Sequence, residues 1–176
     1  MIIQGKELEQ RAIEQVAELM CAAARTAPKA RGIDNLVVMV VKGRTKDQLV
    51  EEMKKIARDS GALFFERDAN CLEKTPLAVL LGQKVRPLGV SPCGYCGFVN
   101  CKENTEKSGL CAISIGDLGI ALGSAANVAA QYHIDNRIMF SVGRAAINLD
   151  IFEEDVKIAY GIPLSVSGKS PFFDRS

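Results

Sequence analysis

The chain has 176 residues, with 22 Lys and Arg against 21 Asp and Glu, for a formal net charge of +1. A chain of this length buries about 70% of the surface that its unfolded form exposes, so it needs no cross-links to stay folded. Because the charges are spread along the sequence, they indicate neither nucleic acid nor an anionic membrane as a partner. We expect a single domain over residues 1–176.

The N-terminal sequence and the cysteine content predict a cytoplasmic protein. The first ten residues, MIIQGKELEQ, turn polar after Ile3 and leave no room for the apolar stretch of a secretory signal. We also expect no transmembrane segment, because no apolar run approaches the roughly 20 residues that cross a bilayer. In a reducing compartment the six cysteines are not expected to form structural disulfides, and clustered cysteines there more often bind metal or do redox work.

The first third of the chain predicts a helix, a strand and a second helix. Apolar residues recur on one helical face from residue 6 to about residue 25. The β-branched run 35–41, NLVVMVV, is typical of a strand buried on both sides. Thr45 and Gln48 form a capping-box pattern at the start of the next helix, and Gly61 is placed to end it.

The rest of the chain alternates apolar runs with small residues. Segments 62–68 (ALFFERD) and 76–82 (PLAVLLG) predict further strands. A long helix rich in Gly and Ala is expected to begin at Asp117, and segments 138–143 and 156–166 supply the last apolar runs. Strands mixed with helices predict one layered domain of the α/β or α+β class.

Segment 91–112 is a cysteine-rich loop with little regular periodicity. Four of the six cysteines fall within it: Cys93, Cys96, Cys101 and Cys111. The first two form a CxxC turn, a spacing at which two thiolates can point at one metal centre. Gly94 and Gly97 allow tight backbone paths around that turn, and they leave amides free to donate to sulfur.

Three kinds of site compete for these four cysteines. A 4Fe-4S cluster needs four thiolates from several directions, and a CxxC pair followed by two further cysteines supplies them. Structural zinc also accepts four thiolates, although its sites usually come as two separated knuckles and only one is present here. A thiol–disulfide switch at Cys93 and Cys96 is the third reading, disfavoured because glycines replace the helix that normally follows a redox CxxC.

The segment PCGYCGFVNC resembles the CxxCGxxxC element of the 4Fe-4S domain found in anaerobic electron-transfer and corrinoid-linked proteins. In that domain the fourth cysteine follows a longer spacer. Here Cys111 comes sooner and is followed by Ala112 rather than proline. Asp117 lies near enough in sequence to be a substitute oxygen ligand.

The whole chain resembles a family of uncharacterised bacterial and archaeal proteins that contain a ferredoxin domain. The stretches that carry this resemblance are AARTAPKARGIDNLVV, SPCGYCGFVNC, CAISIGDLGIALGSAAN and KIAYGIPLSVSGKSPFFDR. The resemblance implies the fold of flavin-dependent nitroreductases, a three-layer α+β sandwich, here with the cysteine-rich loop inserted. It also implies a homodimer, the usual assembly of that fold.

The resemblance makes FMN a candidate second cofactor. In nitroreductases a helix leads into an Ala-Pro-Ser-x-x-Asn turn that contacts the flavin, and AARTAPKARGIDN occupies the corresponding place. Lys29 stands where the serine would be, and Gly32 stands where the asparagine would be. Four basic residues are candidates to bind the flavin phosphate, and each could equally be a solvated surface charge: Arg25, Lys29, Lys169 and Arg175.

Three further residues fit structural roles better than functional ones. Cys21 and Cys71 lie apart from the cysteine loop and are expected to pack as small apolar side chains. His133, the only histidine, is expected to cap a helix end.

Two functions from different classes remain open. The first is a redox protein whose cluster passes electrons to or from a bound flavin or a partner protein, either as an electron carrier or as a flavin-linked oxidoreductase. The second is a non-enzymatic binding or scaffold protein with a structural zinc clip.

Overall fold

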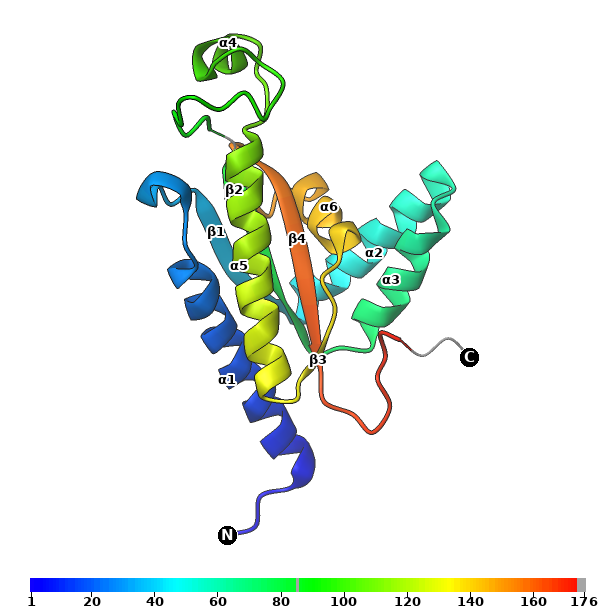
Figure 1. The fold of residues 1–176 in the computed structure, drawn as a ribbon. Helices are drawn as coiled ribbons and strands as arrows, with labels where there is room; N and C mark the ends of the chain where they lie inside the picture. Colours follow the sequence, from blue (N-terminus) through cyan, green and yellow to red (C-terminus); the bar gives the residue numbers. More distant parts are fainter. Residues whose placement is uncertain (85, 174–176) are drawn as a thin grey trace.

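A computed structural model describes residues 1–84 and 86–173 of the chain, and Figure 1 shows its fold. Its centre is a four-stranded sheet with the order β1-β2-β4-β3, in which every neighbouring pair is antiparallel. In chain order the elements are α1 (Gly5–Thr26), the 3₁₀ turn η1 (Ala30–Gly32), β1 (Leu36–Lys42), α2 (Gly43–Ser60), α3 (Leu63–Glu73), β2 (Leu77–Lys84), α4 (Cys101–Glu106), α5 (Ala112–Gln131), β3 (Asp135–Asn136), α6 (Phe140–Asn148) and β4 (Val156–Ser165).

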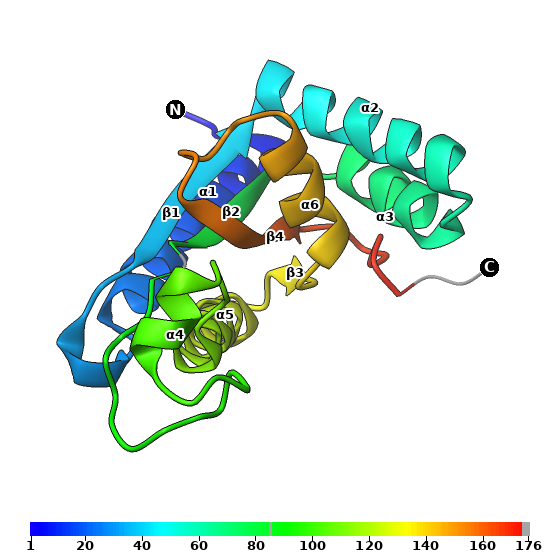
Figure 2. The same cartoon turned by 90° about the horizontal axis from the view of Figure 1, so that it is seen from above.

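Helices cover both faces of the sheet and make three layers, which confirms the predicted α+β sandwich. Helices α1 and α5 pack together on one face, whereas α2, α3 and α6 pack on the other (Figures 1 and 2). Each interface has its own apolar core: Met20, Leu81 and Leu118 belong to the first, and Leu49, Leu72 and Leu80 belong to the second. Alternate residues of β2 therefore point into opposite cores.

Burial along the strands follows their place in the sheet. β2 is central, and its residues from Leu77 to Gln83 are all buried. β1 lies at the edge and is only partly buried, with Val40 39% exposed. The expectation that the first strand is buried on both sides is therefore wrong, because a β-branched run does not distinguish a central strand from an edge strand.

Three further sequence predictions are wrong, one about the type of an element and two about where a helix begins. Segment 62–68 predicts a strand, but it forms the first part of α3, since Phe65, Ala69 and Leu72 recur at helical spacing and are buried. Helix α2 begins at Gly43, which puts Thr45 inside its first turn rather than at its cap. α5 begins five residues before Asp117, directly after the last cysteine of the loop.

Helix α5 also departs from the expectation that no long apolar run exists. Among the described residues it alone is long and apolar enough to cross a membrane, judged by its 20 residues and mean hydropathy of 1.4. Core helices of globular proteins meet the same criteria. Here Leu118, Ala121 and Ala125 are buried in the core that α5 shares with α1 and the sheet.

The cysteine-rich loop projects beyond the sheet at one end of the molecule. It leaves the end of β2, contains the short helix α4, and returns to the start of α5 (Figure 1). A buried hydrogen bond closes its base, because Gln83 Nε2 at the end of β2 donates to Ser114 Oγ in the first turn of α5 at 2.8 Å. The loop thus begins and ends on adjacent, buried elements.

Two glycines let α6 lie directly on β4. A methyl group at Gly143 would overlap the carbonyl of Ala159, and one at Gly161 would overlap the side chain of Val142. Only glycine permits this approach of helix backbone to strand backbone.

We predict that Gly143→Ala destabilises the fold by about 1–3 kcal/mol, because the added methyl meets backbone that has no rotamer to change. Thermal and urea unfolding followed by circular dichroism measures the difference. Gly5→Ala is the matched control: its methyl meets only a glutamate side-chain end at 3.8 Å and should change stability by less than about 0.5 kcal/mol. Equal stability of the two variants would contradict the packing described here.

Candidate metal centre

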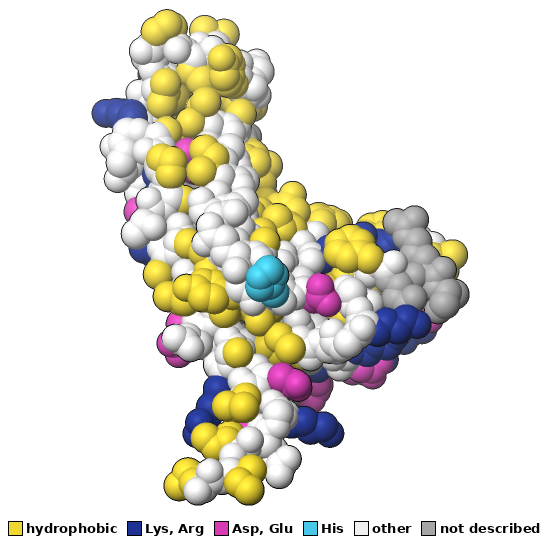
Figure 3. Space-filling model, turned by 60° about the horizontal axis from the view of Figure 1, so that its bottom comes forward, with side chains coloured by type: hydrophobic (Ala, Val, Ile, Leu, Met, Phe, Trp, Pro, Cys, Tyr) yellow, Lys and Arg dark blue, Asp and Glu magenta, His cyan; other side chains and the backbone are white. Residues whose placement is uncertain are grey.

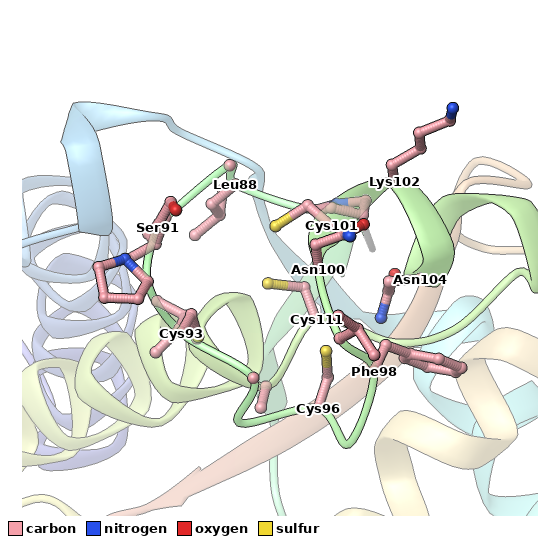
Figure 4. A pocket seen from close by; sticks show the side chains of 18 residues that line it. Leu88, Ser91, Cys93, Cys96, Phe98, Asn100, Cys101, Lys102, Asn104 and Cys111 are labelled. Carbon is pink, nitrogen blue, oxygen red and sulfur yellow. The ribbon is translucent and has the colours of Figure 1, made fainter.

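The cysteine loop encloses a pocket of about 490 Å³, within the usual range for ligand sites. All four predicted ligands line it: Cys93, Cys96, Cys101 and Cys111. Figure 4 shows the sulfur atoms of Cys96, Cys101 and Cys111 turned toward the same space, with Cys93 on the neighbouring stretch of the loop. Within the described residues, no three His, Cys, Asp or Glu side chains are gathered tightly enough to hold one metal ion. The thiols surround a pocket rather than converge on a point.

The CxxC turn owes its shape to two glycines. Gly94 and Gly97 have φ values of 78° and 84°, a left-handed conformation that side chains disfavour. The Gly97 N–H donates to the Gly94 carbonyl at 3.0 Å and closes the turn. Cys93 is exposed and Cys96 is half-buried. The predicted role of the glycines in the backbone path is confirmed.

Two hydrogen bonds at the N-terminus of α4 fix the third cysteine at the first position of this helix. Asn100 Oδ1 accepts the Glu103 N–H at 3.0 Å, and the Glu103 carboxylate accepts the Val99 N–H at 2.8 Å. The hydrogen bond from Lys107, followed by that from Val99, lowers the pKa of Glu103. The carboxylate is therefore ionised near neutral pH and keeps its place in the cap.

A small core inside the loop holds the segment between the third and fourth cysteines. Asn104 is 1% exposed, and its Nδ2 donates to the Leu110 carbonyl at 3.1 Å. Its backbone carbonyl accepts the Gly109 N–H at 2.8 Å, and the Phe98 ring lies where a side chain at Gly109 would be. Asn104 also lines the pocket, and its Oδ1 has no hydrogen-bond partner in the described part of the chain.

The fourth cysteine lies at the N-terminus of α5. Cys111 is the N-cap residue of α5, is 8% exposed, and is followed in the pocket wall by Ala112 and Ile113. The first N–H groups of a helix lack intrahelical partners, and the helix macrodipole adds partial positive charge there. This end of α5 therefore favours anionic sulfur in the pocket.

The predicted substitute ligand lies elsewhere. Asp117 is buried one turn further along α5, and both of its carboxylate oxygens accept the Ala30 N–H at 3.1 Å. It does not line the pocket. Arg31, which follows Ala30 in the chain, donates to the Leu88 and Gly89 carbonyls at 2.8 and 3.1 Å, at the start of the cysteine loop.

The two remaining cysteines are remote from the pocket, as predicted. Cys21 lies on α1, half-buried against the α1–α5 core. Cys71 lies on α3, where its thiol donates to the Pro171 carbonyl at 3.1 Å. Burial, followed by the charge of a neighbouring carboxylate, raises the pKa of both thiols. His133 lies just beyond α5, at the end opposite the loop (Figure 3).

The predicted phosphate donors Arg25 and Lys29 are engaged in internal hydrogen bonds. Arg25 pairs with Asp34 and donates to the Leu36 carbonyl at 2.8 Å. The Lys29 ammonium donates to three carbonyls at the end of α1, those of Ala24, Arg25 and Ala27, at 2.7 to 3.3 Å. Since an ammonium has three protons, none is left for a phosphate. Arg175 lies outside the described residues.

The fourth candidate, Lys169, lines a second pocket of about 780 Å³ on the far side of the molecule from the cysteine loop. This pocket lies between the start of α1, the end of α3 and the segment after β4. Its charged and hydroxyl-bearing side chains are three lysines, two glutamates and four hydroxyls: Lys6, Lys74, Lys169, Glu9, Glu73, Thr75, Ser165, Ser167 and Ser170. The Ser170 hydroxyl is buried and has no partner among the described residues.

Comparison with solved structures places the fold among the FMN-dependent nitroreductases. A nitroreductase from Desulfitobacterium hafniense with bound FMN has a TM-score of 0.58 and 16% identity, over 96% of this chain and 81% of its own. The nitroreductase CinD from Lactococcus lactis, in complex with nicotinic acid, has a TM-score of 0.60 and 14% identity over 92% and 84%. At such identities the likeness shows the fold alone, which confirms the predicted nitroreductase-like architecture.

Sequence comparison then identifies the family. Residues 107–175 match the profile of a family described as "Uncharacterized protein containing a ferredoxin domain", a segment that includes Cys111 but not the other three pocket cysteines. An uncharacterized protein from Archaeoglobus fulgidus is 38% identical over 100% of this chain and 98% of its own length. The chain belongs to this family of ferredoxin-domain proteins.

Proposed function

We propose that the chain is a redox protein that holds a 4Fe-4S cluster in the loop pocket, with Cys93, Cys96, Cys101 and Cys111 as ligands. The observation that carries the proposal is that these four of the six cysteines line one pocket, at the N-terminus of α5. The ferredoxin-domain family and the nitroreductase fold both support a redox role.

The donor set and its surroundings suit a cluster. Thiolates are the usual ligands of iron–sulfur clusters, and in a 4Fe-4S cluster each binds a different iron. Four thiols spread around a pocket match that requirement. A single zinc ion needs its four thiolates about 2.3 Å from one point, which the described cysteines do not provide without moving. The free N–H groups at the start of α5 supply donors for anionic sulfur.

The loop residues would control how electrons reach this site. When bound, the cluster accepts or donates one electron at a time. Cys93 is exposed, so the ligand set reaches the protein surface on one side. Tyr95 and Val99, 78% and 85% exposed, place apolar side chains beside it, and hydrophobic side chains gather on the projecting loop in Figure 3. An electron-transfer partner protein would dock against these residues.

The alternative is a scaffold protein with the same fold, in which the loop closes around structural zinc. Both functions use the same cysteines, so the identity of the metal separates them. We prefer the 4Fe-4S cluster because the four thiols surround a pocket rather than one point, and because the family is described as containing a ferredoxin domain.

We predict that the four pocket cysteines are needed to bind iron and sulfide and that the other two cysteines are not. Oxygen-free wild-type protein should contain about four iron and four acid-labile sulfide per chain. Changing any pocket cysteine to serine should remove roughly half or more of both, because a hydroxyl binds iron poorly at neutral pH. Iron and sulfide assays with visible absorption measure the loss.

Cys21→Ser and Cys71→Ser are the matched controls, since both residues lie in the helical layers away from the pocket. Both should keep full iron and sulfide. One zinc per chain without sulfide in the wild type would contradict the 4Fe-4S cluster and support the scaffold protein with structural zinc. Loss of iron from Cys71→Ser with retention in Cys111→Ser would show that the fourth ligand is wrong.

We propose further that the lysine-lined pocket holds the phosphate of FMN. Its three lysines outnumber its two glutamates, Glu9 and Glu73, and its lysines and hydroxyls are hydrogen-bond donors. The Ser170 hydroxyl is buried and has no hydrogen-bond partner among the described residues. A phosphate carries charge and acceptor oxygens that these groups suit. The bound FMN of the D. hafniense nitroreductase supports flavin as the second cofactor.

Lys169→Gln should weaken FMN binding about tenfold or more, the loss expected for one charge-assisted hydrogen bond. Quenching of flavin fluorescence during titration measures the affinity. Lys29→Gln is the control and should leave it unchanged, since the Lys29 ammonium is used by α1. Unaltered FMN affinity in Lys169→Gln, together with a loss of FMN affinity in Lys29→Gln, would contradict this site and indicate that the phosphate binds at the end of α1.

We also propose a homodimer formed through the outer face of α5. Gly116, Gly119 and Gly123 are open to solvent, and Ile120 between them is 47% exposed. Small residues along one helix face let a second helix approach closely. Figure 3 shows further hydrophobic side chains across the middle of this side of the molecule.

Ile120→Glu should convert the dimer to a monomer, because it places a charge at the centre of an apolar contact. Light scattering at micromolar concentration should give twice the chain mass for the wild type and the single mass for the variant. Leu8→Glu, at another exposed apolar position, should remain dimeric. A monomeric wild type would contradict the assembly.

A further inference from the structure

Arg31 joins the layer of α1 and α5 to the root of the cysteine loop. One nitrogen of its guanidinium donates to the Leu88 carbonyl at 2.8 Å and to the Gly89 carbonyl at 3.1 Å. Both carbonyl residues line the cysteine pocket, and Leu88 is 2% exposed. A side chain at Gly89 would collide with the Arg31 guanidinium, so the two segments are in close contact.

The backbone that presents this side chain is itself held in place. Arg31 has a φ of 57°, a left-handed conformation that costs energy for any residue with a Cβ. The preceding N–H, that of Ala30, is fixed by the buried carboxylate of Asp117 on α5. Strained residues persist where surrounding contacts determine them, and here the contacts lead to the pocket wall.

Arg31 forms no ion pair with a carboxylate among the described residues. The basic residues of the loop are paired, Lys107 with Glu103 at 2.7 Å and Lys102 with Glu106 at 3.9 Å. Arg86, just after β2, pairs with Asp155. The Asp117 carboxylate lies close in the fold, but it binds the Ala30 N–H and forms no ion pair with Arg31.

We infer that Arg31 is a positioning residue for the cysteine loop and raises the reduction potential of the cluster that the loop holds. The inference rests on the proposed cluster. Reduction by one electron makes the cluster more negative, and a nearby cation stabilises the more negative state. Hydrogen bonds to the base of the loop, and a charge beside it, are among the means by which a protein changes the reduction potential of a metal site.

Redox titration of oxygen-free protein, followed by absorption, tests this with Arg31→Gln, Arg31→Lys and the control Arg58→Gln. Arg58 is exposed at the end of α2 on the opposite face of the sheet. Arg31→Gln should lower the midpoint potential, or lose iron and sulfide, whereas Arg31→Lys and Arg58→Gln should stay near the wild type. The shift in Arg31→Gln should shrink at high salt, because Arg31 is exposed and salt screens exposed charges.

A loaded Arg31→Gln protein with wild-type iron and potential would overturn the inference and leave the proposed cluster intact. A defect in Arg31→Lys as large as that in Arg31→Gln would also overturn it, since lysine keeps the charge and can donate to the same carbonyls. Wild-type protein without iron and sulfide would instead overturn the proposed function, and this inference with it.

Discussion

The hydrogen bond between Gln83 and Ser114 closes the base of the cysteine loop, and the rest of the site depends on that closure. Both side chains are almost completely buried, at 2% and 0% exposure, where a broken hydrogen bond would cost about 1–3 kcal/mol. The bond joins the end of the most buried strand to the first turn of α5. The partners are 31 residues apart in the sequence, and joining them reduces the conformational freedom of the loop between them.

Helix α5 connects the three proposed properties of the protein. Its N-terminus forms one wall of the cysteine pocket, its buried face completes the core with α1, and its outer face is open for a second copy of the chain. Asp117 in its second turn fixes the turn that carries Arg31. A change on this helix is therefore expected to affect assembly, packing or the cysteine site according to the face it alters, whereas a change on α2 should affect stability alone.

Much of the fold, and the clustering of four cysteines in one loop that lines a single pocket, could be predicted from the sequence, because these depend on local patterns. The apolar period of α1, the run in β2 and the clustered cysteines are readable without knowledge of distant contacts. The strand predicted at 62–68 failed because adjacent aromatic residues are typical of strands, whereas the helical spacing of Phe65, Ala69 and Leu72 becomes clear only over a longer stretch, where these residues pack against α2 and α6. Arg31, Asn104 and Gln83 could not be found at all. The partners of Arg31 and Gln83 are 57 and 31 residues away in the sequence. The partners of Asn104, Leu110 and Gly109, are close in sequence, but its burial depends on how the irregular loop folds around it.

The four thiols at the start of α5 are proposed to bind four iron atoms in one pocket. Crystals grown without oxygen and measured with X-rays on both sides of the iron absorption edge would locate that iron. We expect a compact group of four anomalous scatterers in contact with Cys93, Cys96, Cys101 and Cys111. A single scatterer at the zinc edge in the same pocket, or iron bound anywhere else in the chain, would contradict it.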